Sequence, residues 1–294
     1  MLRVVGLSKR YGRILALDKL DLAILADHRQ PHHRGPGRWK TTQRFILCYN
    51  TQLMELYIIR HAQSTNNALV DQSTRVADPP LTELGIRQAE TLAQHLATRR
   101  DLADLPQIAW AYSMSNPRQE PGYGITRLLC SPMWRSLQTA EPIARALGLK
   151  PEIWIDIHEV GGLFLEEEAG IVGYGGKTRQ DLLAEYPDYL IPEAVTDQGW
   201  WTSGLEEVTA RDARALRVAV RLRQWSQSNE RIAIVTHGGF LSRLIKYLFN
   251  EPAGRLVFHQ HYNAAISRLE FRADGLLICN YLNRADFLPP DMLT

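Results

Sequence analysis

The residues best suited to chemistry in this 294-residue chain stand directly after short apolar runs. Arg60 and His61 end the run LYII, and His237 follows RIAIVT. Arg135 comes shortly after RLLC, and Glu159 shortly after EIWIDI. Two permanent cations, two imidazoles and one carboxylate are thus placed at the ends of four candidate strands.

Together these residue types suit the handling of a phosphoryl group. The guanidinium groups of Arg60 and Arg135 are planar forks that match phosphate oxygens. A helix that begins at Gly238–Gly239 would add free backbone amides and a positive dipole end. The imidazole of His61 can attack phosphorus if its other nitrogen is held as a donor. Because a bare carboxylate repels phosphate, Glu159 fits the site best as a proton carrier.

The hydrophobic pattern predicts the elements that would position these side chains. Near-continuous apolar runs predict strands over 56–60 and 231–237, and weaker runs predict strands over 127–131 and 152–157. Helical spacing predicts helices over 81–100, 132–148, much of 206–227, and after Gly239. Thr82 is the predicted N-cap of the first helix, and Gly148 ends the second. The tail predicts a β-hairpin that turns at Ala273–Gly275.

Alternation of strands and helices from Met54 onward predicts an α/β domain. In an open α/β sheet, ligands bind beyond the carboxyl ends of the strands. We therefore expect the polar groups named above to share one edge of the sheet.

Five segments carry a family resemblance. They are RHAQSTNN (60–67), LTELGIRQA (81–89), CSPMWRSLQTA (130–140), HEVGG (158–162) and VTHGG (235–239). In order and approximate spacing they resemble the histidine phosphatase superfamily, over about residues 54–283. The resemblance implies the phosphoglycerate mutase-like three-layer α/β fold, with a mostly parallel central sheet and helices on both faces.

The resemblance also implies a phosphohistidine mechanism without a metal or other cofactor. It makes His61 the nucleophile and Glu159 the proton donor. The residues expected to hold the phosphoryl group are Arg60, Asn67, Arg135, His237 and Gly238. The substrate partner would be a small phosphorylated metabolite, and its identity stays open.

Some of these assignments have rivals. Asp156, Glu166, Glu167 and Glu168 lie near Glu159 in the sequence, and Asn66 precedes Asn67. The family usually has glycine after the nucleophilic histidine, where this chain has Ala62. If the backbone needs a positive φ at this point, alanine would be strained there.

Other polar clusters are given structural interpretations. His259 and His261 would share a strand face, but two ligands without a carboxylate indicate a hydrogen-bonded or solvated pair rather than a metal site. A stripe of arginines on the predicted helix over 206–227 is expected to be a solvated face paired with Glu206 and Glu207. The stripe consists of Arg211, Arg214, Arg217 and Arg221.

Composition sets the broad class. The chain is 45% hydrophobic and 22% charged, and 34 Lys and Arg face 32 Asp and Glu, so charge gives no argument for nucleic acid or membrane as a partner. Three cysteines without metal-type spacing indicate reduced thiols. With no signal-peptide pattern and no membrane-length apolar segment, we predict a cytoplasmic protein of unassigned oligomeric state.

The first 53 residues differ in character from the rest. Residues 1–42 resemble a degraded N-terminal fragment of an ABC transporter ATPase, but GPGRWKTT lacks the glycine spacing of a phosphate loop. We predict a non-catalytic extension over 1–53 and a catalytic domain over 54–294 that opens at Met54. Insertions rich in Gly, Pro and aromatics are predicted at 101–125 and 161–204.

Three functions follow from these residues. A phosphomonoester phosphatase is favoured, because the segment HEVGGLFLEEE differs from the acid loop of cofactor-dependent mutases; a phosphoglycerate mutase-type transferase and a non-catalytic phosphate-binding protein are the alternatives. The aromatics of the 161–204 insertion are expected to roof the pocket, namely Tyr174, Tyr186, Trp200 and Trp201. Lys177 and Arg179 would meet further negative charge or solvent.

Overall fold

The structure is a computed structural model that describes residues 2–11, 14–24, 53–99, 122–251 and 257–294. The chain divides into two units, Met1–Thr51 and Gln52–Thr294. In the first unit, β1 (Leu2–Tyr11) pairs antiparallel with β2 (Ile14–Ile24). The second unit contains all the candidate site residues. The non-catalytic role of the extension stays a prediction.

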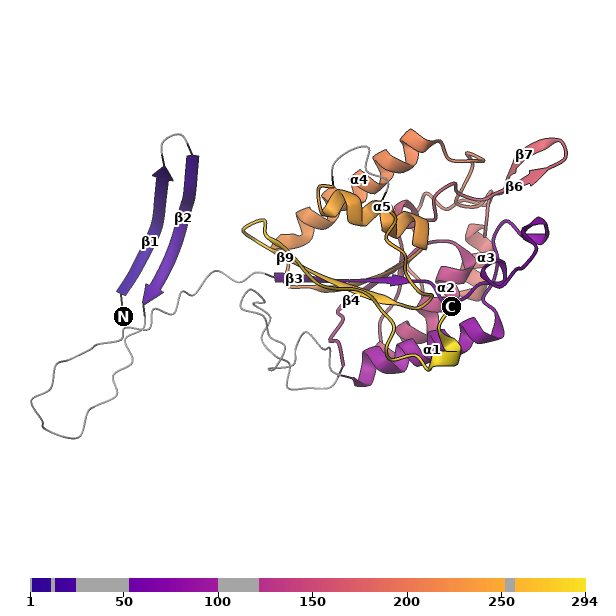
Figure 1. The fold of residues 1–294 in the computed structure, drawn as a ribbon, viewed down its shortest axis with the longest axis horizontal. Coiled ribbons are helices and arrows are strands. Elements are labelled where there is room, and N and C mark those ends of the chain that lie inside the picture. The colour runs from indigo at the N-terminus through magenta and orange to yellow at the C-terminus, as the bar shows by residue number, and fades with distance from the viewer. Residues whose placement is uncertain (1, 12–13, 25–52, 100–121, 252–256) are drawn as a thin grey trace, which may run out of the picture. The chain divides into compact units, whose positions relative to one another are not determined.

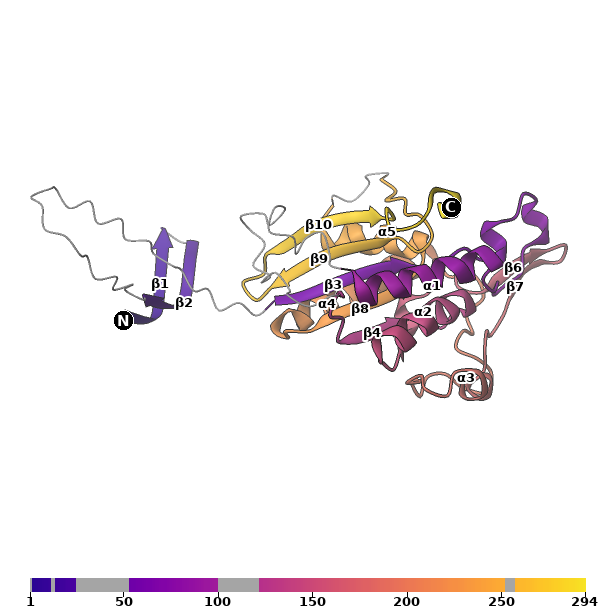
Figure 2. The ribbon, with the colours of Figure 1, turned by 90° about the horizontal axis from the view of Figure 1, so that it is seen from below.

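The second unit is built on one six-stranded sheet of order β10-β9-β3-β8-β4-β5 (Figures 1 and 2). Its strands are β3 (Leu53–Arg60), β4 (Arg127–Cys130), β5 (Glu152–Ile153), β8 (Arg231–Thr236), β9 (Ile266–Arg272) and β10 (Leu277–Arg284). The pairs β3–β8, β8–β4 and β4–β5 are parallel, whereas β9 is antiparallel to both β3 and β10. The predicted mostly parallel sheet and the C-terminal hairpin are confirmed.

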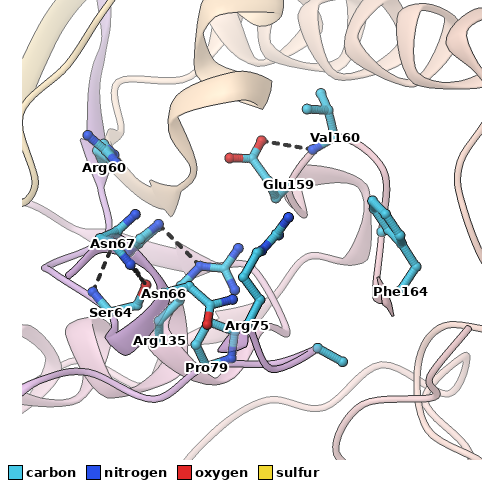
Figure 3. A pocket seen from close by; sticks show the side chains of 13 residues that line it. Arg60, Ser64, Asn66, Asn67, Arg75, Pro79, Arg135, Glu159, Val160 and Phe164 are labelled. Carbon is cyan, nitrogen blue, oxygen red and sulfur yellow. Dashed lines mark hydrogen bonds between the residues drawn. The ribbon is translucent and has the colours of Figure 1, made fainter. Parts of the chain in front are cut away.

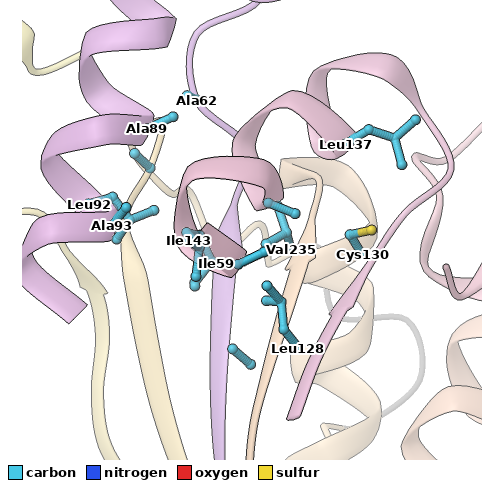
Figure 4. Packing of buried hydrophobic residues seen from close by; sticks show 14 of the residues in the cluster. Ile59, Ala62, Ala89, Leu92, Ala93, Leu128, Cys130, Leu137, Ile143 and Val235 are labelled. Atoms are coloured by element: carbon cyan, nitrogen blue, oxygen red, sulfur yellow. The ribbon is translucent and has the colours of Figure 1, made fainter. Parts of the chain in front are cut away.

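Helices cover both faces of this sheet, as expected. The helices α1 (Glu83–Thr98) and α2 (Trp134–Leu147) pack on one face, and α4 (Val208–Gln224) and α5 (Gly238–Leu248) on the other. Alternate residues of β3 serve the two cores: Tyr57 and Ile59 join the α1–α2 side, and Leu56 and Ile58 the α4–α5 side. Figure 4 shows part of the first core. Burial of both faces explains why β3 is a continuous apolar run.

Local signals in the sequence set the ends of these helices. The Oγ1 of Thr82 accepts a hydrogen bond from the amide of Gly85 at 2.9 Å, which confirms the predicted N-cap of α1. Gly148 ends α2 with a φ of 66°, a left-handed conformation that glycine adopts at little cost. Within α1, Gly85 also allows a close approach, because a Cβ there would lie 2.1 Å from the carbonyl oxygen of Gln63.

The predicted strand over 152–157 is largely wrong. Only Glu152–Ile153 forms β5, which pairs at the sheet edge with Leu129 and Cys130. The chain then enters a short 3-10 helix, η4 (Ile155–Ile157). On its outer side β5 forms only an isolated bridge, between Glu152 and Leu190, and this pairing does not continue along the following residues. After this early turn Glu159 reaches the residues that follow β8, where its carboxylate accepts hydrogen bonds from the amides of Gly239 and Phe240.

The second predicted insertion contains elements of its own. The antiparallel hairpin of β6 (Phe164–Glu167) and β7 (Gly170–Gly173) comes first, followed by the short helix α3 (Arg179–Glu185). Most of the first predicted insertion, residues 101–121, lies outside the described residues. Of the helices that the structure describes, none has both the length and the apolar character needed to cross a membrane.

Candidate active site

Three of the predicted chain segments meet around one cavity of about 160 Å³ (Figure 3). Arg60 is the last residue of β3, His61 follows it, Arg135 lies in the first turn of α2, and Glu159 follows η4. The lining residues are Arg60, His61, Ser64, Asn66, Asn67, Arg75, Ala77, Pro79, Arg135, Glu159, Val160, Gly162 and Phe164. The structure therefore brings five of the seven predicted site residues to one cavity.

The imidazole of His61 is held in one tautomer. Its Nδ1 lies 2.6 Å from the carbonyl oxygen of Ala62, and its Nε2 lies 3.2 Å from Nε of Arg135. A carbonyl oxygen only accepts hydrogen bonds and a guanidinium only donates them, so the proton resides on Nδ1 and the lone pair on Nε2. Burial, and then the charges of Arg135 and Arg60, hold the pKa of His61 well below 6.5. His61 is therefore neutral at neutral pH, and its Nε2 carries the lone pair that accepts the hydrogen bond from Arg135.

The two predicted arginines are fixed from behind. Nη1 of Arg60 donates to the carbonyl oxygen of His261 at 2.5 Å. A Cβ on Gly238 would lie 3.3 Å from Nε of Arg60, so the glycine lets helix α5 begin close to this guanidinium. Arg135 is buried, and its Nη1 lies 3.8 Å from Oδ1 of Asp78.

Asp78 is a site neighbour that the sequence pattern did not reveal. Its Oδ1 accepts a hydrogen bond from the amide of Trp134 at 3.0 Å, at the start of α2, besides facing Arg135. Burial raises the pKa of Asp78 to about 6 against the opposing effect of Arg135. The only signal available was an aspartate just before PPLT, a loop position that by itself indicates a turn.

His237 lies behind His61 and does not line the cavity. Its ring centroid is 5.0 Å from that of His61, its side chain is fully buried, and Nε2 lies 2.7 Å from Oγ of Ser131. Its Nδ1 is buried with no hydrogen-bond partner among the described residues. Burial, followed by the charge of Arg135, holds the pKa of His237 well below 6.5. A neutral ring with an unused nitrogen is thus stacked obliquely against the candidate nucleophile.

Two of the amides at the start of α5, those of Gly239 and Phe240, are not free, contrary to the sequence-based expectation. The Glu159 carboxylate accepts hydrogen bonds from Gly239 N at 3.2 Å, from Phe240 N at 2.8 Å, and from Val160 N at 2.8 Å. The positive end of the helix therefore holds the candidate proton carrier rather than an empty anion site. A Cβ on Gly239 would lie 2.7 Å from Oε1 of Glu159, so glycine is required where the carboxylate docks.

A buried ion pair supports the segment that carries Glu159. Arg214 is 2% exposed and pairs with both oxygens of Glu206, at 2.7 and 2.6 Å. Its Nη1 also donates to the carbonyl oxygens of Asp156 and His158, each at 2.8 Å. The expected solvated arginine stripe is therefore wrong at Arg214. Its partner Glu206 was predicted correctly, but the pair is buried because α4 packs against the turn after β5.

Asn67 and Asn66 both line the cavity but have different bonds. The Oδ1 of Asn67 accepts hydrogen bonds from the amide of Ser64 at 3.1 Å and from Nδ2 of Asn263 at 3.2 Å. Asn66 instead exchanges two hydrogen bonds with the backbone of Val76, at 2.8 and 3.1 Å. With its oxygen engaged, Asn67 can offer only its Nδ2 protons to a ligand.

Ala62 causes no strain. Its φ is not among the positive values in the described chain, its side chain is fully buried, and its amide donates to Oγ1 of Thr139 at 3.1 Å. A positive φ, of 60°, does occur nearby at Ala264, just before the adjacent strand β9, where the amide donates to the carbonyl oxygens of Arg60 and His61.

Of the predicted acidic rivals, those in the described chain lie away from the nucleophile. Asp156 pairs with Arg217 at 3.1 Å, and Glu166 and Glu167 border a separate outer cavity. Glu168, in the exposed turn of the β6–β7 hairpin, lines neither cavity. Only Glu159 contributes a carboxylate to the described lining of the His61 cavity.

The aromatic residues that were expected to cover the pocket do not line it. Trp200 and Tyr186 are buried in the core, and Trp201 packs against it, so that Gly162 and Phe164 are the residues of this insertion that line the cavity. Tyr174 lies apart, with its hydroxyl donating to Glu167.

The two predicted cations of this insertion are engaged elsewhere. Lys177 pairs with Glu185 at 2.7 Å and lies 4.4 Å from the ring centroid of Trp134. Arg179 donates to the carbonyl oxygen of Pro192 at 3.0 Å. The additional cation in the cavity lining is Arg75, which the sequence pattern did not single out.

The remaining polar candidates are hydrogen-bonded within the fold. Nε2 of His259 lies 2.6 Å from Glu251, and the ring nitrogens of His261 lie 2.9 Å from the carbonyl oxygen of His259 and from Oγ of Ser267. No cluster of three His, Cys, Asp or Glu suited to a metal occurs within the described ranges. Cys130 and Cys279 are free thiols, and Cys48 lies outside the described residues.

Comparison with known proteins identifies the family. The family model described as the histidine phosphatase superfamily, branch 1, matches residues 56–105 and 118–283. The chain therefore belongs to the histidine phosphatase superfamily, a superfamily of enzymes. The resemblance of residues 1–42 to an ABC transporter ATPase is not borne out.

Curated relatives are similar over most of their length. A protein named probable phosphoglycerate mutase GpmB from Cronobacter sakazakii is 28% identical over 242 residues, covering 78% of this chain and 91% of the relative. Its namesake from Proteus mirabilis is 24% identical over 224 residues, covering 75% and 86%.

Solved structures are more distant in sequence. Mycobacterial glucosyl-3-phosphoglycerate phosphatase is 18% identical with a TM-score of 0.46, covering 79% of this chain and all of that chain (100%). Phosphoserine phosphatase from Entamoeba histolytica, in complex with 3-phosphoglyceric acid, is 19% identical with a TM-score of 0.47, covering 80% and 100%. At these values the likeness says nothing about substrate.

Proposed function

We propose that this protein is a phosphomonoester hydrolase that acts on a small phosphorylated metabolite through a phosphohistidine at His61. The proposal rests on the tautomer of the His61 imidazole and on the position of its lone pair. Its Nδ1 proton is committed to the Ala62 carbonyl, and its Nε2 lone pair lies beside Arg135 at the wall of the cavity. A neutral nucleophile flanked by fixed guanidinium groups suits attack on a phosphate dianion.

In the first step Nε2 of His61 forms a bond to phosphorus as the ester P–O bond breaks. The guanidinium groups of Arg60 and Arg135 stabilise the charge on the non-bridging oxygens. Nδ2 of Asn67 and the fixed backbone near Gly238 would complete the grip on the phosphoryl group. His237 would stabilise the phosphorylated ring from behind. The carboxyl group of Glu159, protonated at this stage, gives its proton to the leaving oxygen.

In the second step Glu159, now a carboxylate, accepts a proton from water. The water oxygen bonds to phosphorus while the P–Nε2 bond of His61 breaks, which releases inorganic phosphate and restores both groups. General acid–base assistance of this kind contributes about 10²–10⁴ in rate.

A mutase function is the second candidate, favoured by the names of the curated relatives. A mutase returns the phosphoryl group to another hydroxyl, so it must shield phosphohistidine from water. A hydrolase is preferred here because the segment around Glu159 differs from the mutase acid loop. A non-catalytic phosphate-binding role would leave the fixed tautomer of His61 without a purpose.

Replacement of His61 tests the catalytic proposal. His61→Asn should abolish hydrolysis of a generic aryl phosphate, and the wild-type protein, quenched in alkali during turnover, should gain the mass of one phosphoryl group on His61. His259→Asn, outside the cavity, is the matched control and should keep both aryl phosphate hydrolysis and the phosphorylation of His61. Equal turnover by His61→Asn and the wild type would refute the mechanism.

A second measurement separates hydrolase from mutase. Incubation with 2- or 3-phosphoglycerate should release inorganic phosphate faster than it forms the isomer. Isomerisation that clearly outpaces phosphate release would assign the mutase function instead.

A further inference from the structure

Arg75 is a third arginine in the His61 cavity, beyond the two that face the phosphoryl group. It lines the cavity, and its exposed side chain makes no hydrogen bond or ion pair with another described residue. Figure 3 shows this side chain reaching into the cavity between Arg135 and Glu159. An exposed arginine on a flexible segment would be an ordinary surface residue. The segment that carries Arg75 is instead held by hydrogen bonds.

The backbone beside Arg75 is pinned on both sides. On one side, the Asn66 side chain donates to the carbonyl oxygen of Val76 at 2.8 Å and accepts from the Val76 amide at 3.1 Å. On the other, the 3-10 helix η2 (Gln72–Thr74) is capped by Asp71, and the Arg75 amide closes it on the carbonyl oxygen of Gln72 at 3.4 Å. Arg75 therefore projects from a fixed point at the cavity rim.

The position of Arg75 relates two cavities. Arg75 and Phe164 line the inner cavity with His61, and both also line the outer cavity, bordered by Gln72, Glu166 and Glu167. A substrate that has its phosphoryl group against Arg60 and Arg135 and extends from the inner cavity into the outer one would pass beside Arg75. No ion pair joins Arg75 to the carboxylates of the outer cavity within the described chain, so its charge is available to the substrate.

The positive charges in the cavity lining favour an anionic group as the ligand of Arg75. Burial lowers the pKa of Arg135 most, the carboxylates of Asp78 and Glu159 raise it, and the charge of Arg75 lowers it further, so the two guanidinium groups repel each other across the cavity. Asp78, 3.8 Å from Nη1 of Arg135, offsets part of this repulsion, but the described lining sets only the Glu159 carboxylate against the three guanidinium groups of Arg60, Arg75 and Arg135. An anion placed between the cations and solvent relieves the remaining repulsion.

We propose that Arg75 binds a second anionic group of the substrate, so that the enzyme acts on small phosphomonoesters carrying a carboxylate or a second phosphate near the ester. The inference rests on the proposed function, since it assumes that the phosphoryl group occupies the His61 end of the cavity. Arg75 would thus set specificity, while Arg60 and Arg135 serve the transfer itself.

A matched pair of substrates tests this. 3-Phosphoglycerate and glycerol 3-phosphate share a three-carbon skeleton and differ in a carboxylate against a hydroxymethyl group. The wild type should prefer the carboxylate by about tenfold or more in kcat/KM, which corresponds to about 1.4 kcal/mol. Arg75→Gln should lower this ratio towards one, mainly by raising KM for the carboxylate-bearing substrate, and Arg75→Lys should retain part of it. Arg145→Gln, which removes a surface arginine paired with Glu90, is the control and should keep the ratio.

A second pair, fructose 1,6-bisphosphate against fructose 6-phosphate, distinguishes a second phosphate from a carboxylate as the preferred partner. A wild-type ratio near one for both pairs, or a ratio that Arg75→Gln leaves unchanged, would overturn the role of Arg75 and leave the proposed hydrolase intact. Failure of the wild type to turn over any of the four compounds or an aryl phosphate would overturn both.

Discussion

Nε of Arg135 donates a hydrogen bond to Nε2 of His61 over 3.2 Å, although 74 positions separate the two residues in the chain. The same guanidinium that would grip a phosphoryl oxygen thus holds the lone pair of the nucleophile before substrate arrives. Binding of a phosphate would compete for the Nε proton and release Nε2 towards phosphorus. The cation therefore orients His61 and also keeps the ring neutral.

Arg135→Gln should raise the pKa of His61 towards 6.5, because it removes the charge that, after burial, contributes most to lowering it. NMR titration of the imidazole measures this shift, with Arg145→Gln as the control. Loss of the guanidinium should also lower kcat by about 10²–10³. An unchanged His61 titration in a folded variant would contradict the stated cause.

Stability should fall as the solution is acidified below pH 6.5. Burial lowers the pKa of His158 and of His261 to about 4, so each binds its proton more tightly in the unfolded chain. Each should therefore cost about 1.4 kcal/mol of unfolding free energy per pH unit between 6.5 and 4. Asp78 has a raised pKa of about 6, so the folded chain binds its proton more tightly, and this carboxyl group adds stability as the pH falls below 6.

The variant His261→Asn tests this dependence of unfolding free energy on pH, measured by urea unfolding at several pH values. It removes one titrating group while keeping the backbone carbonyl that receives Arg60. The slope between pH 6.5 and 4 should become shallower by about the amount given for one histidine. His259→Asn is the matched control, and an equal change in both variants would rule out burial of His261 as the origin.

Gly85→Ala should destabilise the fold by about 1–3 kcal/mol, because the new Cβ would lie 2.1 Å from the Gln63 carbonyl oxygen. The intrinsic helix preference for alanine works against this loss and is smaller. Activity should fall as well, since Gln63 belongs to the loop that follows His61. Gly148→Ala is the control, with open space around it and only its left-handed φ to strain. A gain in stability for Gly85→Ala would disprove the close contact.

Arg214→Lys should slow alkyl phosphates more than aryl phosphates. Arg214 acts through the carbonyl oxygens of Asp156 and His158, which fix the segment bearing Glu159. A leaving group that needs a proton depends on that placement, whereas an aryl leaving group depends on it less. The ratio of kcat for the two substrate classes measures the effect, and Glu159→Gln should show it more strongly. Equal losses for both classes would leave Arg214 with a purely structural role.

Removal of residues 1–53 should leave activity and melting temperature nearly unchanged. The compact unit that holds every candidate site residue spans Gln52–Thr294. Thermal unfolding and aryl phosphate hydrolysis of the shortened chain measure this. A large loss in either would mean that the extension packs on the catalytic unit.

Sequence alone predicted much of the sheet and the meeting of Arg60, His61, Arg135 and Glu159 at one cavity. Continuous apolar runs predicted β3 and β8, because parallel strands buried on both faces need them. Caps at Thr82 and Gly148 are local interactions, so they too could be predicted.

Tertiary structure decided what depends on contacts between distant segments. Glu159 occupies the amides of α5, Arg214 is buried rather than solvated, and Asp78 and Arg75 belong to the site although no local pattern marks them. The physical reason is that burial and charge pairing are set by what packs against a residue. Sequence spacing determines only which face of its own element the residue occupies.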